Sequence, residues 1–244
     1  MSAGKFIFMI KIFFTLSLVL VFTALSGQKT EYRLGFSSGL FSFSGKSAQT
    51  SSFINYSQPS NTAYTNNPYG SQQGFCYGLL ANMKRVSKKN FVFGIEAAFE
   101  RVKSVININM VNKYDGMSTT QFNVGGKTYL AFNFINLQPF AGYRFALKGL
   151  AFDLTAGVDV AFCLQAKENG NATAANGTTY NTSLDRKTIT TDIRPRLQIS
   201  TGYKSFGVYF GYSFGQTNYK AGYIGGTNDA YAEFLRFGFT YLLK

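Results

Sequence analysis

The sequence predicts an all-β fold, an eight-stranded antiparallel up-and-down transmembrane β-barrel, and three patterns support this class. Apolar residues alternate with small or polar residues in segment after segment, which is the two-residue period of a β-strand. The connections between these segments alternate between long and short, as they do in transmembrane barrels. A segment typical of an export signal precedes the first strand.

Residues 1–27 are predicted to be a signal peptide that is removed after export. Lys5 and Lys11 form its basic region, residues 12–25 form its apolar region, and small residues follow. A membrane anchor is the alternative interpretation, but the apolar core is shorter than the roughly 20 residues that a comfortable span requires. Residues 28–244 then form one outer-membrane β-barrel domain.

The first three predicted strands are residues 31–44, 75–86 and 91–100. Large apolar side chains occupy every second position in each, and the tight connection 87–90 joins the second strand to the third. A long polar segment separates the first strand from the second. The alternating apolar residues are Tyr32, Leu34 and Phe36, then Phe75, Tyr77, Leu79, Ala81 and Met83, then Phe91, Phe93, Ile95, Ala97 and Phe99.

The fourth and fifth predicted strands are residues 127–146 and 150–164. In the fourth, the apolar phase shifts by one residue at Phe134–Ile135, which indicates a β-bulge. Pro139 cannot donate a ladder hydrogen bond, so we expect irregular pairing there. Residues 105–126, before the fourth strand, are ambiguous between a loop and an extension of the third strand beyond the membrane.

The last three predicted strands are residues 188–203, 206–215 and 230–243. The first two form a hairpin around Lys204 and Ser205, with Ile, Leu and Phe on one face and Arg, Gln, Ser and Gly on the other. Each of these two strands is long enough to cross a bilayer at a tilt of about 45°.

The lengths of the connections predict the orientation of the barrel. Short connections follow the second, fourth and sixth strands, and long connections follow the first, third, fifth and seventh strands. Because short turns of transmembrane barrels face the periplasm, an even strand number places the N- and C-termini on that side. The predicted location is therefore the outer membrane of a Gram-negative bacterium.

The two faces of the strands differ in side-chain size and charge. One carries Phe, Tyr, Leu, Ile and Val, and the other carries Gly, Ala, Ser, Thr and isolated charges. A water-facing surface would carry about a quarter to a third charged residues. The pattern therefore favours lipid on the apolar face over a soluble lipocalin-like barrel, in which the faces would be exchanged.

Charged residues on the small-residue face are predicted to lie in the lumen. Acids and bases alternate between neighbouring strands, so we expect them to form salt bridges that fill the narrow interior of an eight-stranded barrel. A gate or an ion site is the alternative role. The set is Glu96, Glu100, Arg144, Asp153, Asp159, Asp192, Arg194 and Arg196, with Arg236 near the closing seam.

The two cysteines, Cys76 and Cys163, are predicted to be free thiols. An exported protein reaches a compartment that permits disulfides. The two residues lie three strands apart, however, which strains the limit on the Cα separation of a disulfide.

The formal net charge of +13 predicts contact with anionic lipid rather than nucleic acid. Lys and Arg lie mostly near the strand ends and form no single patch, which suits the head groups of outer-membrane lipid and lipopolysaccharide. Plain solvated charge is the alternative. Examples are Arg33, Arg85, Lys148 and Lys204 at one set of ends, and Lys103, Lys127, Lys167 and Arg186 at the other.

Residues 135–145, with the sequence INLQPFAGYRF, and the run 156–158 resemble the PorT-like outer-membrane β-barrel proteins of Bacteroidetes. The final strand resembles the signal that barrel-assembly machinery recognises, although it ends in Leu-Lys rather than Phe. The resemblance implies a barrel and contact with that machinery, and only some family members act in secretion or gliding. The assembly-signal residues are Arg236, Gly238, Tyr241 and Leu243.

The sequence predicts no catalytic, cofactor-binding or metal site. The enzymes among outer-membrane barrels use histidine in their known sites, and this chain has none. We therefore expect a scaffold whose long loops bind an envelope partner or a surface ligand. The alternative function is a narrow channel for small solutes. Candidate loop contacts are Tyr56, Tyr64 and Tyr69, and packing of these rings against the barrel rim is the alternative.

Overall fold

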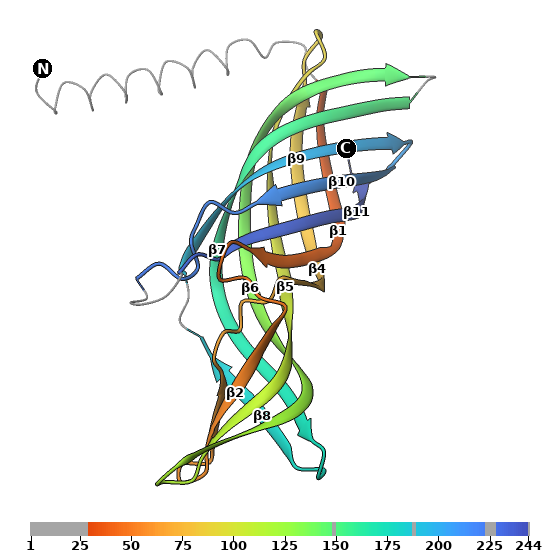
Figure 1. Cartoon of the computed structure of the whole chain (residues 1–244). Coiled ribbons are helices and arrows are strands. Elements are labelled where there is room, and N and C mark those ends of the chain that lie inside the picture. The colour runs from red at the N-terminus through yellow and green to blue at the C-terminus, as the bar shows by residue number, and fades with distance from the viewer. Residues whose placement is uncertain (1–28, 148–149, 187–188, 223–227, 244) are drawn as a thin grey trace, which may run out of the picture.

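Eight strands form a ring in which neighbours pair antiparallel, and the first and last strands pair with each other to close a barrel (Figure 1). The computed structural model describes residues 29–147, 150–186, 189–222 and 228–243, so the predicted signal peptide lies outside the described residues. Within those residues, no helix is long and apolar enough to cross a membrane. The ring consists of β1 (Lys29–Ser44), β4 (Gln72–Val86), β5 (Phe91–Tyr114), β6 (Thr119–Leu147), β7 (Leu150–Ala174), β9 (Thr191–Tyr203), β10 (Phe206–Phe214) and β11 (Tyr231–Leu242). The predicted eight-stranded fold is confirmed.

The outer surface of this ring is apolar. In β4, Leu79 points outward and is 65% exposed, whereas the neighbouring Leu80 points inward and is 4% exposed. The same alternation repeats along β10, where Phe206, Val208 and Phe210 are exposed. A continuous band of exposed large apolar side chains suits hydrocarbon and not water. The barrel is therefore a transmembrane barrel, with the faces assigned as the sequence predicted.

Short turns gather at one end of the barrel. Tyr203 pairs with Phe206 across the turn between β9 and β10, and Lys204 within it adopts a φ of 53°. Tight hairpins need such left-handed conformations to match the twist of their strands. The backbone N–H of Leu243 donates to the carbonyl of Tyr32 (2.8 Å), so both ends of the described chain lie at this short-turn end.

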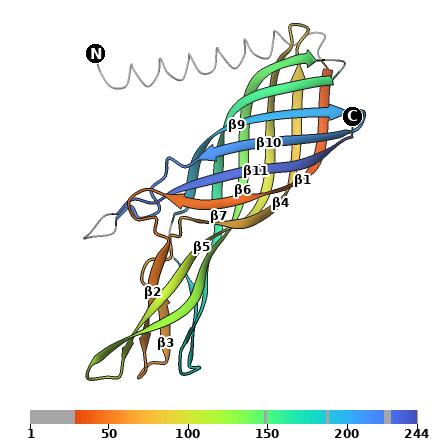
Figure 2. The ribbon, with the colours of Figure 1, turned by 45° about the vertical axis from the view of Figure 1, so that its right-hand side comes forward.

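Strands continue past the opposite rim and form an extension, shown below the barrel in Figures 1 and 2. β5 and β6 run on as one hairpin to a turn at residues 115–118, and β7 does the same with β8 (Thr179–Asp185). β2 (Ser51–Ser57) pairs in parallel with β5 and carries β3 (Thr62–Thr65) on its other side. The prediction of long polar loops was therefore wrong for most of these segments. Of the two interpretations of residues 105–126, the extended strand is the observed one.

The extension has its own small apolar core. Its buried residues come from β2, β5, β7 and β8, which makes it a folded unit rather than a set of loose loops. Sequence reasoning missed these strands because their many Asn, Thr and Ser residues weaken the alternation of apolar and polar positions. The buried residues of this core are Ile54, Ile106, Ile108, Val111, Ala172 and Tyr180.

The predicted bulge lies in β7 and not in β6. Asn133 pairs with Gln165 and Phe134 pairs with Cys163, so Leu164 is the extra residue. Inward and outward residues alternate along β6 without a break. The apolar residues change face because Leu130, Phe132 and Phe134 point into the lumen, whereas Ile135 and Leu137 face lipid. Pro139 lies where the pairing of β6 with β7 is interrupted, as predicted.

Candidate functional site

Ion pairs that cross the lumen are the clearest feature of the barrel interior. Arg196 of β9 donates to Glu96 of β5 (2.9 Å), and Arg236 of β11 donates to Glu100 of β5 (2.7 Å). Neither pair joins neighbouring strands of the ring, so both contacts span the interior. All four side chains are at most 5% exposed.

Asp159 of β7 links these two pairs into one network. It lies 3.0 Å from Arg236 and 3.5 Å from Arg196, and it accepts a hydrogen bond from the Ser213 hydroxyl (3.2 Å). Arg236 therefore contacts two carboxylates, and the network connects β5, β7, β9, β10 and β11. Because a buried charge is costly unless it is paired, this layer is stable only when the partners are present together.

Arg194 and Asp192 form the next layer toward the extension. They lie 3.4 Å apart and are fully buried, and Arg194 also donates to the Asn136 amide oxygen (3.2 Å) and lies over the Phe134 ring. The Tyr219 hydroxyl donates to Asp192 (2.7 Å). This layer joins the polar network to an aromatic cluster.

Aromatic side chains close the lumen on the extension side of that layer. Phe43 contacts Tyr69 and Tyr219 with ring centroids 5.2 and 4.9 Å apart, and every member of the cluster is at most 3% exposed. We call this cluster the aromatic plug. It consists of Phe41, Phe43, Tyr69, Phe132, Phe134, Tyr219 and Phe234. Of the two alternatives for Tyr69, packing against the barrel is the observed one, and Tyr69 is not an exposed loop contact.

The two cysteines lie beside the aromatic plug and are free. Cys76 of β4 is fully buried, and its thiol donates to the Gly74 carbonyl (3.3 Å). Cys163 of β7 is half-buried and packs against the same cluster. The prediction of free thiols is confirmed.

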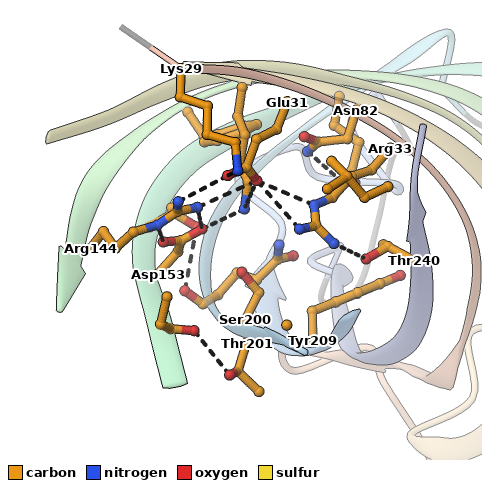
Figure 3. Close-up of a pocket in the computed structure, with 18 of the residues that line it drawn as sticks. Lys29, Glu31, Arg33, Asn82, Arg144, Asp153, Ser200, Thr201, Tyr209 and Thr240 are labelled. Atoms are coloured by element: carbon orange, nitrogen blue, oxygen red, sulfur yellow. Dashed lines mark hydrogen bonds and ion pairs between the residues drawn. The ribbon is translucent and has the colours of Figure 1, made fainter. Parts of the chain in front are cut away.

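The other end of the lumen is an open vestibule with a cavity of about 180 Å³ (Figure 3). Arg144 and Asp153, which the sequence placed in the lumen, lie here and are joined by a 2.6 Å ion pair. Glu31 accepts from Arg144 as well (2.9 Å). Lys84 bonds Asp153 directly and lies 3.5 Å from Glu31.

All eight predicted lumen charges and Arg236 therefore face the interior. Neighbouring strands pair as expected in Arg144–Asp153 and Arg196–Asp159. The pairs Arg196–Glu96 and Arg236–Glu100, which cross the lumen, were not expected.

Sequence reasoning missed Glu31 and Lys84, and it placed Arg33 among the strand-end charges expected to contact anionic lipid or water. The sequence could have identified Glu31 and Arg33, because they alternate along the strand with the outward residues Tyr32 and Leu34. Side chains at alternate positions of a strand point to opposite faces, so these two point inward.

The residues of the predicted assembly signal divide between the two faces of β11. Arg236 and Gly238 face the lumen, and Tyr241 and Leu243 are exposed on the outside. A Cβ at Gly238 would lie 2.7 Å from the Tyr209 ring and 2.3 Å from the Phe36 carbonyl oxygen. The Tyr209 ring therefore occupies space that any side chain larger than that of glycine at position 238 would fill.

The extension carries a groove of about 480 Å³ between the β2–β3 hairpin and β8. Tyr56 and Tyr180 meet there with ring centroids 5.2 Å apart, and the Tyr56 hydroxyl donates to Asn61 (3.1 Å). Burial raises the pKa of the Tyr180 hydroxyl, with a smaller contribution from Tyr56, so this group is a neutral donor at neutral pH. Lys113 is the one charged residue among those lining the groove, all of which are described.

Buried polar contacts fix the base of this extension to the barrel. Glu168 of β7 accepts from the backbone N–H of Thr65 (2.7 Å) and from Arg186 (2.7 Å). Arg186 also donates to the Thr65 carbonyl (2.6 Å). Tyr64, the third predicted loop contact, is 45% exposed beside Arg186, whose guanidinium lies 6.0 Å from the ring centroid.

The tip of the β5–β6 hairpin is closed by one carboxylate. Asp115 accepts from the backbone N–H groups of Ser118 and Met117, each at 2.8 Å. These hydrogen bonds hold the pKa of Asp115 below its ordinary value. Across the described residues, no group of three or more His, Cys, Asp or Glu side chains is placed to hold a metal ion.

No family model matches the sequence, and no curated protein matches it. Among solved structures, the chain is similar to Neisserial surface protein A (NspA), with 14% identity over 88% of this chain and 99% of that chain, and a TM-score of 0.39. It is also similar to the outer membrane protease OmpT from Escherichia coli, with 11% identity over 88% and 96% of the two chains, and a TM-score of 0.35. At this distance neither protein transfers an activity to the chain.

Proposed function

We propose that this chain is a non-enzymatic outer-membrane barrel that holds its extension outside the cell as a binding surface for an envelope partner or surface ligand. The observation that carries the proposal is the combination of a filled lumen with a folded extension. Two charged layers and the aromatic plug occupy the interior. Beyond the aromatic plug, the extension offers an accessible groove of about 480 Å³.

The proposed orientation follows from the barrel geometry. Short turns of transmembrane barrels face the periplasm, so the short-turn end and both described chain ends would lie there. The extension would then project from the cell surface, where lipopolysaccharide surrounds the rim. Export through the signal peptide of residues 1–27 and insertion by barrel-assembly machinery belong to the same proposal, as does the PorT-like resemblance of residues 135–145.

The character of the groove supports a recognition role. Its aromatic rings offer apolar contact area, and its amides and hydroxyls both donate and accept hydrogen bonds. Amide and hydroxyl groups suit a polar, uncharged surface on the partner. The polar groove residues are Gln58, Asn61, Thr178, Thr179 and Asn181.

Site-specific photo-crosslinking in whole cells tests this proposal. A photoreactive amino acid at Asn61, in the groove, should give a discrete protein or glycan adduct. As a control, the same photoreactive amino acid is placed at Lys89, which lies in a short turn at the opposite end of the barrel. The additional change Tyr56→Ala should abolish the Asn61 adduct while the barrel still folds. An adduct of equal yield at Lys89, or one that survives Tyr56→Ala, would count against the groove.

Single-channel recording tests the competing channel function. The purified barrel in a planar bilayer should show no stable openings, because the aromatic plug and the charged layers fill the lumen. Stable openings that change when Arg196 is replaced by Gln would support a channel instead.

A further inference from the structure

The vestibule at the short-turn end is a cavity lined by charge, and nothing in the proposed function uses it. It occupies about 180 Å³ among the inward residues of the ring, which is much more room than a single water needs. Exposed Lys29 and Lys204 lie at its mouth. Figure 3 shows Glu31, Arg144 and Asp153 together on one side of the cavity and Tyr209 on another.

Positive charge exceeds negative charge in this cavity. Five cationic side chains line it, against three carboxylates. One of those carboxylates, Glu96, is held by Arg196 from the layer beyond. The cations are Lys29, Arg33, Lys84, Arg144 and Lys204.

The two remaining carboxylates are shared among these cations. Arg33, Lys84 and Arg144 all lie within 3.5 Å of Glu31, and Lys29 lies at 4.0 Å. Asp153 contacts two of the same cations. Of the three cations within 3.5 Å of Glu31, Arg33 is the one that does not also contact Asp153, and its contacts to Glu31 and to the Thr240 hydroxyl are all 3.4 Å long.

A buried hydroxyl without a partner also lines the cavity. Tyr209 is 5% exposed, and its hydroxyl has no hydrogen-bond partner among the described residues. Such a group is costly when left unsatisfied, so buried hydroxyls are almost always hydrogen-bonded. The Tyr209 ring packs directly against Gly238 in the barrel wall, and the Arg196 guanidinium lies 5.8 Å from the centroid of this ring.

We propose that the vestibule binds a small oxyanion, a phosphate or carboxylate group, that enters from the periplasmic side. The oxyanion would accept hydrogen bonds from the Tyr209 hydroxyl and from Arg33 and would offset the surplus positive charge. Charged oxygens are the acceptors that guanidinium groups prefer. A neutral or cationic solute offers no such match.

Calorimetric titration of the purified full-length barrel in a non-ionic detergent tests the site. Phosphate and succinate are the two probes, titrated against sodium chloride of equal ionic strength, with glucose as the neutral solute. We expect one saturable site for at least one of the two anions, and none for glucose. The preferred probe distinguishes a phosphate ligand from a carboxylate ligand. Saturable binding of glucose with the same affinity, or of neither anion, would overturn the proposal.

Two substitutions with matched controls locate the site. Tyr209→Phe removes the hydroxyl and keeps the ring, so the barrel should fold while anion affinity falls about tenfold, the range of one hydrogen bond to a charged group. Tyr212→Phe on the same strand changes an outward hydroxyl and should leave affinity unchanged.

Arg33→Gln should weaken binding by a similar factor, and Arg85→Gln, whose residue alternates to the outer face at the same end, should not. Binding that both Tyr209→Phe and Arg33→Gln leave intact would overturn the assignment. The groove in the extension takes no part in these experiments, so their failure would leave the proposed function in place.

Discussion

The ion pair between Arg236 and Glu100 should contribute measurably to stability because both charges are buried. Arg236 is fully buried and makes two contacts to Glu100, at 2.7 and 3.0 Å, and one to Asp159, at 3.0 Å. Breaking a buried ion pair typically costs about 3–5 kcal/mol, because one charge is left uncompensated. Since Asp159 remains beside Arg236, we expect Glu100→Gln to cost about 3 kcal/mol, at the lower end.

A double-mutant cycle measures the interaction energy between Arg236 and Glu100 separately from their interactions with other residues. Arg236→Met alone should also destabilise the barrel, because Glu100 then keeps only neutral partners. The double variant should cost less than the sum of the single variants, with a coupling energy of about 2 kcal/mol. Glu233→Gln, on the outward face of the same strand, is the control and should stay within about 0.5 kcal/mol.

Reversible unfolding by urea in lipid vesicles would measure these free energies. The chain contains no Trp, so far-ultraviolet circular dichroism or the mobility difference between folded and unfolded bands must report the transition. A coupling energy below about 0.5 kcal/mol, or a Glu100→Gln variant as stable as the unaltered protein, would refute the reasoning that the cross-lumen pairs hold the barrel together.

Three further perturbations have clear expected outcomes. Deleting Leu197 should abolish the heat-modifiable folded band, because every later residue of β9 would change face; deleting Asn176, in the turn between β7 and β8, should leave the band in place. In the folded barrel, Cys76 should resist a maleimide that labels it after unfolding, because it is fully buried; rapid labelling in the folded state would contradict the plug geometry. Because the pKa of Asp115 is lowered in the folded chain, its stabilisation of the hairpin tip is present above the ordinary pKa and lost as pH falls through the folded value. Amide-exchange protection of the two N–H groups that it accepts from should therefore fall at acidic pH, and Asp115→Asn should remove this pH dependence.

Alternation made the barrel predictable, because lipid imposes the same requirement on every outward residue. The alternation was least informative for residues that do not face lipid, because an outward apolar side chain is required only in the membrane. Phe132 and Phe134 are apolar for a different reason, since they fill the lumen, and the sequence does not distinguish this environment from lipid. The strands of the extension, such as β8, contact water on one face and a small core on the other, so their apolar residues are few.

Within the lumen, sequence reasoning found which residues point inward but not which of them meet. Partners such as Glu96 and Arg196 are 100 positions apart and on strands that are not adjacent in the ring. Their contact depends on barrel diameter and strand stagger, which no local pattern encodes. Glu31 was missed because it lies at the very start of the first strand, where a charge is expected to be solvated.

The cross-lumen contacts supply information about strand register that the lipid face cannot supply. A slip of one residue exchanges the two faces and is excluded by hydrocarbon, but a slip of two residues preserves the alternation on the outer surface. Inside, the same slip of β11 would bring Arg236 or Thr240 against the Tyr209 ring, where only Gly238 leaves room. It would also move Arg236 away from Glu100 and Asp159, so that the buried charges of Arg236 and Glu100 would lose their ion-pair partners. We infer that the buried charges persist because they select one register among those that lipid accepts, even where an apolar lumen would have been equally stable.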